Sequence, residues 1–177
     1  MSGLVVAHTG QLPPAVLSAA RDLLDAVFRG ELTGDDWEHC LGGMHALVWQ
    51  GAELVGHAAL VQRRLLHQGR VLRAGYVEGV AVRADLRRRG HAATMMAALE
   101  DLARRAYDVA ALGATDEGAA FYLSRGWRRW QGSTWVLSPE GVVRTPDEDH
   151  CIYVLALSVS LDLHGELICD WREGDAW

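Results

Sequence analysis

Three strand-like segments that follow one another without an intervening helix limit the possible folds of this chain most. They are residues 44–50, 54–66 and 71–82. Gly51 and Gly69 lie in the short turns between them, and short turns between consecutive strands predict an antiparallel meander. Gly79 lies inside the third segment, where a glycine indicates a bulge or a close approach of another part of the chain.

Segments with helical periodicity lie on both sides of the meander. Before it, apolar residues recur at helical spacing from Val16 to Phe28, and Thr33 can cap a short acidic helix. After it, the patterns predict a helix, a strand, a helix and two strands at residues 90–105, 109–112, 115–124, 127–137 and 151–159. Together with a short strand at residues 4–7, this order predicts one mixed α/β domain over residues 1–177.

Two segments near the end of the chain receive no helix or strand. Residues 138–149 carry two prolines and several carboxylates, so they are expected to form an acidic loop. Residues 161–177 are read as a tail, but tryptophan, isoleucine and leucine are interleaved with its charges. This mixture argues against a floppy, fully solvated extension.

The basic residues exclude several classes of chemistry. All 17 are arginine, and the chain contains neither lysine nor asparagine. The absence of lysine excludes Schiff-base enzymes, pyridoxal-phosphate enzymes and the P-loop, while the absence of asparagine excludes N-glycosylation. The net charge is −6 and no broad basic stripe is present, so no nucleic-acid partner is expected.

The cysteines and the apolar segments indicate a cytoplasmic protein. Cys40, Cys151 and Cys169 are odd in number and lack C-x-x-C spacing, which favours a reducing compartment and no metal site. No apolar run is long enough to span a membrane, and the first eight residues do not resemble a signal peptide. We therefore expect no membrane partner and no metal cofactor.

Acidic residues are concentrated at the end of the chain. Residues 140–177 hold two arginines against nine aspartates and glutamates, a balance of −7, whereas residues 1–139 carry a balance of +1. A segment of this kind can line a cation-binding wall or form a solvated face. The first interpretation predicts a ligand that carries several positive charges.

The most specific motif joins the third meander strand to a helix. Arg87, Arg88 and Arg89 precede Gly90 in a short basic loop, and His91 and Ala92 open the helix. A helix N-terminus offers unpaired N–H groups and partial positive charge, and glycine lets a phosphate approach the backbone. The pattern R-x-x-G-x-A predicts a pyrophosphate cradle. The alternative is a basic loop that only caps the helix.

Two motifs in this order resemble the GNAT acetyltransferase superfamily. Residues 76–92 resemble its motif A, and Ala119-Ala120-Phe121-Tyr122-Leu123-Ser124-Arg125-Gly126-Trp127 resembles its motif B. The resemblance implies an α/β (α+β) fold, in which a mixed, mostly antiparallel sheet is splayed at the acetyl-CoA site and carries helices on both faces. It also implies acetyl-CoA as the donor, with its pyrophosphate at residues 87–92 and its pantetheine arm along the backbone of Val80, Ala81 and Val82.

Further segments narrow the resemblance to the aminoglycoside 2′-N-acetyltransferases over nearly the whole chain. They are residues 36–39, 41–47, 75–85 and 169–177. The implied reaction is transfer of acetyl to the 2′-amino group of an aminoglycoside, which confers antibiotic resistance. Enzymes of this kind are commonly dimers, so a homodimer is expected by resemblance.

The reaction assigns roles to two residues of the motifs. An ammonium group must lose a proton before it attacks, and Glu78 is the candidate base, acting directly or through water. The thiolate that leaves needs a proton donor, and Tyr122 is the candidate acid. A backbone N–H near Val80 can stabilise the charge that develops on the acetyl oxygen. The alternatives are a surface carboxylate for Glu78 and a packing residue for Tyr122.

The resemblance also implies the residues that bind the polycationic acceptor. They are Asp36, Glu78, Gly79, Glu148, Asp175 and Trp177, the last through its terminal carboxylate. No cysteine lies in a nucleophilic arrangement, so direct transfer is expected. Two other functions stay open at this point. One is acetylation of a cellular amine or amino sugar, and the other is a non-catalytic module that binds acetyl-CoA or an aminoglycoside.

Overall fold

The computed structural model describes residues 2–177, so Met1 lies outside the described part of the chain. The chain forms two compact units. The first comprises residues up to 61 together with residues 77–102, and the second comprises residues 62–76 and 103–177. A single domain over residues 1–177 stays a prediction.

The first unit is built on an antiparallel sheet that begins with β1 (Ser2–His8). β1 pairs with β2 (Met44–Gln50), and β2 pairs with the first part of β3 (Glu53–His67) across a tight turn at Gly51. The predicted antiparallel pairing of the first two meander strands is therefore confirmed. β1 is longer than the predicted strand by a few residues at its ends.

Two helices of the first unit lie between β1 and β2 in the sequence. They are α1 (Pro14–Val27) and α2 (Gly34–His39). Thr33 caps α2 as predicted, because its hydroxyl accepts a hydrogen bond from Asp36 N–H while the Asp36 carboxylate accepts one from Thr33 N–H.

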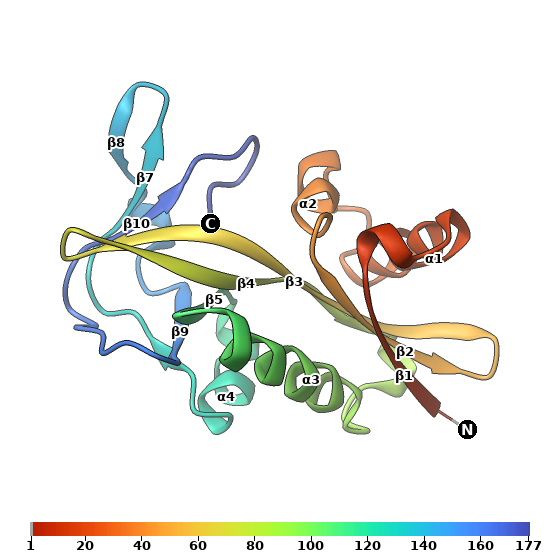
Figure 1. The fold of residues 1–177 in the computed structure, drawn as a ribbon. Coiled ribbons are helices and arrows are strands. Elements are labelled where there is room, and N and C mark those ends of the chain that lie inside the picture. The colour runs from red at the N-terminus through yellow and green to blue at the C-terminus, as the bar shows by residue number, and fades with distance from the viewer. Residues whose placement is uncertain (1) are drawn as a thin grey trace. The chain divides into compact units, whose positions relative to one another are not determined.

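Helices cover both faces of the sheet in the first unit. On one face, α1 and α2 share a buried cluster with Ala59 and Ala81. On the other face lies α3 (His91–Ala106), since a Cβ added to Gly56 would lie 3.2 Å from the side chain of Met95. Residues an odd number of positions apart on a strand point to opposite faces, as Gly56 and Ala59 do. Figure 1 shows α1 and α2 on one side of β1 and β2 and α3 on the other, as the resemblance implied.

The second unit contains a mixed sheet with the strand order β6-β9-β5-β4-β3-β10-β7-β8. Its strands β4 to β10 are Arg70–Val82, Val109–Gly113, Arg128–Arg129, Thr134–Ser138, Gly141–Arg144, Ile152–Ala156 and Leu167–Asp170. β4 pairs with β5 in parallel, as β10 does with β7, and the pairs β5–β9, β6–β9, β7–β8 and β3–β10 are antiparallel. The sheet is therefore mixed and mostly antiparallel, as predicted.

The remaining helices of residues 2–177 are one α-helix of nine residues and three short 3₁₀ helices. α4 (Asp116–Ser124) follows β5 and matches the predicted helix. Three 3₁₀ helices span Thr9–Gln11, Ala84–Leu86 and Pro146–Glu148.

The pairing of β4 with β5 ends early. The register runs from Ala74 opposite Val109 to Tyr76 opposite Ala111, although β4 continues to Val82. A strand that leaves its neighbour in this way frees backbone groups for other partners. This early end of the register is what a splayed sheet requires.

Three sequence-based expectations for the second half of the chain were wrong. Residues 127–137 do not form one strand, because Gly132 presses its backbone against Gly165 and separates β6 from β7. Residues 138–149 are not simply a loop, since β8 completes a hairpin with β7. The tail contains β10, which pairs with β7 and β3. These pairings join segments far apart in sequence, so local patterns do not reveal them.

Candidate functional site

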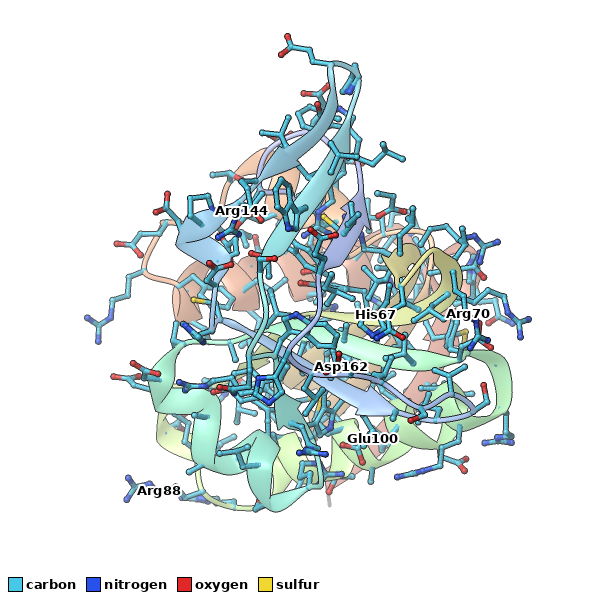
Figure 2. The ribbon with its side chains drawn as sticks, turned by 90° about the vertical axis from the view of Figure 1, so that its left-hand side faces the viewer. His67, Arg70, Arg88, Glu100, Arg144 and Asp162 are labelled. Carbon is cyan, nitrogen blue, oxygen red and sulfur yellow. The ribbon has the colours of Figure 1, made fainter. Side chains whose placement is uncertain are left out.

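The predicted pyrophosphate cradle lies in the first unit, between β4 and α3. Arg87, Arg88 and Arg89 are exposed, and Figure 2 shows Arg88 pointing outward from the protein. Gly90 has a φ of +85°, and the space where its Cβ would be is open. The first helical hydrogen bond runs from Thr94 N–H to the Gly90 carbonyl, at 2.9 Å. The N–H groups that precede it in α3 therefore have no partner within the helix.

These features fit an anionic ligand. Three guanidinium groups and the N-terminus of a 16-residue helix supply positive charge and hydrogen-bond donors. Arg87 also supports the loop, because its Nε donates to the Val82 carbonyl at 3.3 Å. The structure thus brings the predicted residues 87–92 into one exposed, basic turn.

The last part of β4, next to this turn, offers a ligand main-chain groups rather than side chains. Ala81 is buried in the cluster beneath α1 and α2, so its methyl group is not available to a ligand. Val80 and Val82 are half-buried. A ligand that runs along this part of β4 must therefore use main-chain groups, as the resemblance implied.

Gly79 shows why a glycine lies inside β4. Its φ is +55°, in the left-handed region, and a Cβ there would lie 2.8 Å from the Cys40 Sγ and 3.3 Å from the ring of His57. The predicted close approach is confirmed. Glu78, the half-buried candidate base, is the residue before Gly79.

The Gly79 carbonyl accepts a hydrogen bond from His57, which in turn contacts His45, and the sequence alone assigned neither histidine to the site. His57 Nδ1 lies 2.7 Å from this carbonyl, and His57 Nε2 lies 3.0 Å from His45 Nδ1. Both side chains are completely buried. In the register of β2 and β3, His45 lies opposite Ala59 and His57 opposite Leu47, so no local sequence signal could have shown that the two rings meet.

Asp36 serves its own helix. Its half-buried carboxylate accepts Thr33 N–H at 2.8 Å as part of the α2 cap. This hydrogen bond occupies one oxygen, and the second oxygen can still accept from a ligand. The structure therefore shows a capping role for Asp36, and its predicted substrate role stays a prediction.

Tyr122 lies in an aromatic cluster of the second unit. Its side chain is buried, and its ring packs edge-on against Trp127 and in a tilted arrangement against Tyr153. Burial raises the pKa of Tyr122 to about 12. The hydroxyl therefore keeps its proton at physiological pH, as a hydrogen-bond donor or general acid requires.

Three predicted substrate residues meet in one cavity of the second unit. Glu148, Asp175 and Trp177 line a space of about 290 Å³ together with Cys151 and residues 113–115. Burial, then the charges of Asp175 and Asp147, raises the pKa of Glu148. Like charges that raise a carboxyl pKa also attract a cation, which would relieve their repulsion. The cavity therefore suits a positively charged ligand.

Trp177 is fixed in this cavity by a network that the sequence did not suggest. Its indole Nε1 donates to Thr145 Oγ1 at 2.9 Å, and Thr145 Oγ1 lies 3.0 Å from Thr134 Oγ1. Thr134 N–H donates to the Asp149 carboxylate, which also pairs with Arg144 at 2.7 Å. The sequence placed Asp149 only in an acidic loop, whereas the structure ties its carboxylate into this network. Arg144 and Thr134 hold the pKa of Asp149 well below its usual range.

Replacing Thr145 by valine should weaken this network. Valine matches threonine in shape but leaves the indole N–H of Trp177, a residue that is 95% buried, without its acceptor. We expect the free energy of unfolding to fall by about 1–3 kcal/mol, measured by urea denaturation. In a Trp177→Phe background the same change should cost clearly less, because the N–H is already absent. Equal losses in both backgrounds would show that this hydrogen bond is not the source.

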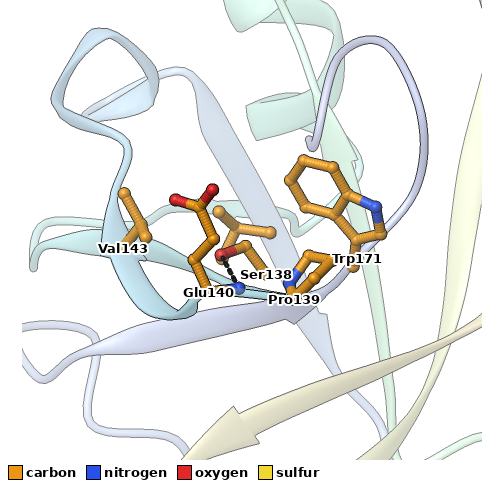
Figure 3. Close-up of a pocket in the computed structure, with 6 residues that line it drawn as sticks. Ser138, Pro139, Glu140, Val143 and Trp171 are labelled. Carbon is orange, nitrogen blue, oxygen red and sulfur yellow. Dashed lines mark hydrogen bonds between the residues drawn. The ribbon is translucent and has the colours of Figure 1, made fainter.

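A second cavity of the same unit contains none of the predicted site residues. It has a volume of about 340 Å³ and is lined by Val136, Ser138, Pro139, Glu140, Val143 and Trp171. Figure 3 shows Ser138 accepting a hydrogen bond from Glu140 N–H at the turn of the hairpin. Glu140, which is exposed, is the one acidic residue among the described residues that line this cavity. This cavity therefore suits a polycation less well than the cavity of Glu148 and Asp175.

Two surveys of the described residues complete the picture. Across residues 2–177, no three or more His, Cys, Asp or Glu side chains cluster as a metal site would need. No helix within the same residues combines the length and apolar character needed to cross a membrane.

Comparison with known proteins shows a match to one domain family and to a relative of known activity. The acetyltransferase (GNAT) domain family matches residues 12–130. An aminoglycoside 2′-N-acetyltransferase of Mycolicibacterium fortuitum is 47% identical over 174 residues, covering 96% of this chain and 89% of the relative.

Solved structures agree with the fold. Escherichia coli ElaA superposes with a TM-score of 0.59 at 23% identity, covering 87% of this chain and 99% of that protein. An acyl-CoA N-acyltransferase from Pseudomonas aeruginosa gives a TM-score of 0.63 at 16% identity, covering 88% and 100%. At these identities the likeness shows the fold alone, and it confirms the predicted α/β architecture.

Proposed function

The chain belongs to the GNAT acetyltransferase family and, within it, to the aminoglycoside 2′-N-acetyltransferases, and we propose that it acetylates the 2′-amino group of aminoglycoside antibiotics with acetyl-CoA. The observation that carries the acceptor class is the acidic cavity of Glu148, Asp175 and Trp177. An aminoglycoside carries several ammonium groups, which a cavity with paired carboxylates attracts. Acetylation lowers the charge of the antibiotic and so confers resistance.

Acetyl-CoA supplies the activated acetyl group as a thioester. Its pyrophosphate is assigned to residues 87–92, where three exposed arginines and the first N–H groups of α3 converge. Its pantetheine arm is assigned to the main chain of Val80, Ala81 and Val82, because the methyl group of Ala81 is buried on the other side. Both assignments use backbone donors and guanidinium groups, so they need no lysine.

Glu78 and Tyr122 are the residues proposed to move protons. Glu78 accepts a proton from the ammonium group of the acceptor, directly or through a water molecule, and so produces the neutral amine that attacks. Tyr122 donates a proton to the leaving thiolate, and its raised pKa of about 12 keeps that proton available. A backbone N–H at Val80 stabilises the charge that develops on the acetyl oxygen.

Transfer is proposed to be direct. Cys151 lines the same cavity as Glu148, so it is the cysteine best placed to compete as a nucleophile. Burial, followed by the charges of Glu148 and Asp116, raises the pKa of the Cys151 thiol. A thiol attacks as its thiolate, and a raised pKa lowers the thiolate fraction. An acetyl-enzyme on Cys151 is therefore disfavoured.

The protein is proposed to act in the cytoplasm as a homodimer, without a nucleic-acid, membrane or metal partner. Cys40, Cys151 and Cys169 form no disulfide in the described part of the chain, which fits a reducing compartment. The net charge of −6 disfavours the phosphate backbone of nucleic acids. The dimer rests on the family resemblance alone, and light scattering of the purified protein tests it.

The acceptor position is tested with two related antibiotics. Tobramycin has a 2′-amino group, whereas amikacin has a hydroxyl at that position. We expect acetyl-CoA-dependent turnover of tobramycin and none of amikacin at the 2′ position, measured by release of free thiol and by mass spectrometry. Acetylation of tobramycin at another amine, or equal turnover of both antibiotics, would contradict the proposal.

A further inference from the structure

His45 and His57, two buried histidines of the first unit, have no part in the proton transfers proposed above. They are nevertheless linked by hydrogen bonds to the carbonyl of Gly79, the residue after the candidate base Glu78. Thr9 Oγ1 lies 2.8 Å from His45 Nε2, and His45 Nδ1 lies 3.0 Å from His57 Nε2. His57 Nδ1 lies 2.7 Å from the Gly79 carbonyl. The four residues therefore form a continuous hydrogen-bond chain that runs from the 3₁₀ helix after β1 through β2 and β3 to β4.

The chain has one direction. The Gly79 carbonyl only accepts, so His57 must carry its hydrogen on Nδ1. In the neutral ring His57 Nε2 then accepts from His45 Nδ1–H, which leaves His45 Nε2 to accept from the Thr9 hydroxyl. Thr9 Oγ1 in turn accepts the N–H of Gly42 at 2.9 Å. The Thr9 hydroxyl also lies 3.3 Å from the Gly43 carbonyl and so has a second acceptor, which means that the Gly79 carbonyl alone determines the order of hydrogens on the two rings.

The surroundings keep both rings neutral. Burial, then the charge of His8, lowers the pKa of His45 to about 4. Burial also lowers the pKa of His57 to about 4, against the opposing effect of its hydrogen bond to Gly79. Neutral rings with this order of hydrogens both carry the proton on Nδ1, and no other neutral arrangement satisfies both the Gly79 carbonyl and His57 Nε2.

Holding this carbonyl also orients the next N–H group. In a trans peptide the carbonyl and the N–H point in opposite directions, so a carbonyl directed at His57 aims Val80 N–H away from it. Gly79 lacks a Cβ and is left-handed at φ +55°, so its peptide would rotate more easily than that of another residue. Cys40 and the His57 ring restrict the space around the Cα of Gly79. The hydrogen bond from His57 to the Gly79 carbonyl sets the plane of the Gly79–Val80 peptide.

We propose that Thr9, His45 and His57 form a positioning chain that sets the plane of the Gly79–Val80 peptide, and with it the direction of the Val80 N–H donor. The catalytic consequence rests on the proposed function, whereas the order of hydrogens does not. His57 is a positioning residue, because it acts through the peptide and not on the substrate.

The kinetic test compares two replacements of His57. Leucine removes the donor to Gly79, whereas the amide nitrogen of asparagine lies near the position of Nδ1 and can restore it. With tobramycin and acetyl-CoA, we expect His57→Leu to lower kcat by about 10- to 100-fold with little change in either KM. His57→Asn should recover most of that loss.

His67 supplies the matched control. It is a second buried histidine whose Nδ1 lies 2.8 Å from a backbone carbonyl, that of Glu166, and whose Nε2 accepts from Asp162 N–H at 3.3 Å. It lies in the second unit, and Figure 2 shows it beside Asp162. His67→Leu should lower stability, measured by urea denaturation, and leave kcat unchanged. Equal kcat losses in His57→Leu and His57→Asn, or a loss in His67→Leu as large as in His57→Leu, would overturn the proposal.

A measurement without activity decides the case even if a variant does not fold. Long-range ¹H–¹⁵N spectra of the wild-type protein should show His45 and His57 both protonated on Nδ1. A hydrogen on Nε2 of His57 would overturn the positioning chain. If the wild-type protein leaves tobramycin unmodified, the proposed function fails, while the hydrogen order seen in these spectra still accepts or rejects the chain.

Discussion

Tyr122→Phe is expected to lower kcat for aminoglycoside acetylation by about 10²- to 10⁴-fold, the range in which general acids contribute. Phenylalanine keeps the ring that packs against Trp127 and Tyr153, so the folded structure should survive. The change removes only the hydroxyl. Because burial raises the Tyr122 pKa to about 12, this hydroxyl should stay protonated as the pH rises. A fall in wild-type kcat between pH 7 and 10 would then come from another group.

Tyr153→Phe provides the comparison for this prediction. Tyr153 is a buried tyrosine of the same cluster, and its hydroxyl accepts from Arg129 Nε at 2.8 Å. Its replacement removes a hydroxyl of the same kind without touching the proposed proton donor. Steady-state kinetics should therefore show nearly unchanged kcat for Tyr153→Phe. If Tyr122→Phe also retains wild-type kcat, Tyr122 is a packing residue and the thiolate leaves without its help.

Gly79→Ala should have the largest effect on stability. A left-handed φ costs a residue with a Cβ about 1–2 kcal/mol, and overpacking a core adds about 1–3 kcal/mol. At Gly79 both apply, since φ is +55° and the new Cβ would lie 2.8 Å from the buried Cys40 Sγ. We expect the free energy of unfolding to fall by about 2–5 kcal/mol, measured by urea denaturation.

Gly30→Ala and a double variant separate the two causes. Gly30 has a φ of +80° with open space around its missing Cβ, so alanine there should cost only the conformational part. Adding Cys40→Ala to Gly79→Ala should recover part of the steric loss, because the sulfur is removed. If Gly79→Ala costs no more than Gly30→Ala, the close approach at Gly79 does not constrain the fold.

Several parts of the site could be read from local sequence because local rules produce them. The basic turn at residues 87–92 follows from a strand, three arginines, a left-handed glycine and a helix start, all within a few positions. Gly79 predicted a close approach of another part of the chain, because glycine inside a strand is otherwise unfavourable. The Thr33 cap follows from its spacing to Asp36. The cavity residues Glu148, Asp175 and Trp177 came from the family resemblance and not from local physics.

Other parts depend on contacts between distant segments. The sequence indicates no partner for Asp149, but its carboxylate pairs with Arg144 and accepts Thr134 N–H. β10 could not be recognised because its partners, β7 and β3, lie far away in sequence. His45 and His57 looked like isolated histidines until the register of β2 and β3 placed their rings within hydrogen-bond distance.

The sequence by itself determined the order of helices and strands in the first unit, the basic turn at residues 87–92 and the absence of lysine chemistry. The first two depend on backbone preferences, which act over a few neighbouring positions. The third depends only on which residue types the chain contains. Only the tertiary structure decided which polar groups are buried together, from the Gly79 carbonyl at His57 to the Trp177 indole at Thr145. A polar group removed from water must find a partner, and which partner it finds is set by strand register and packing between distant segments.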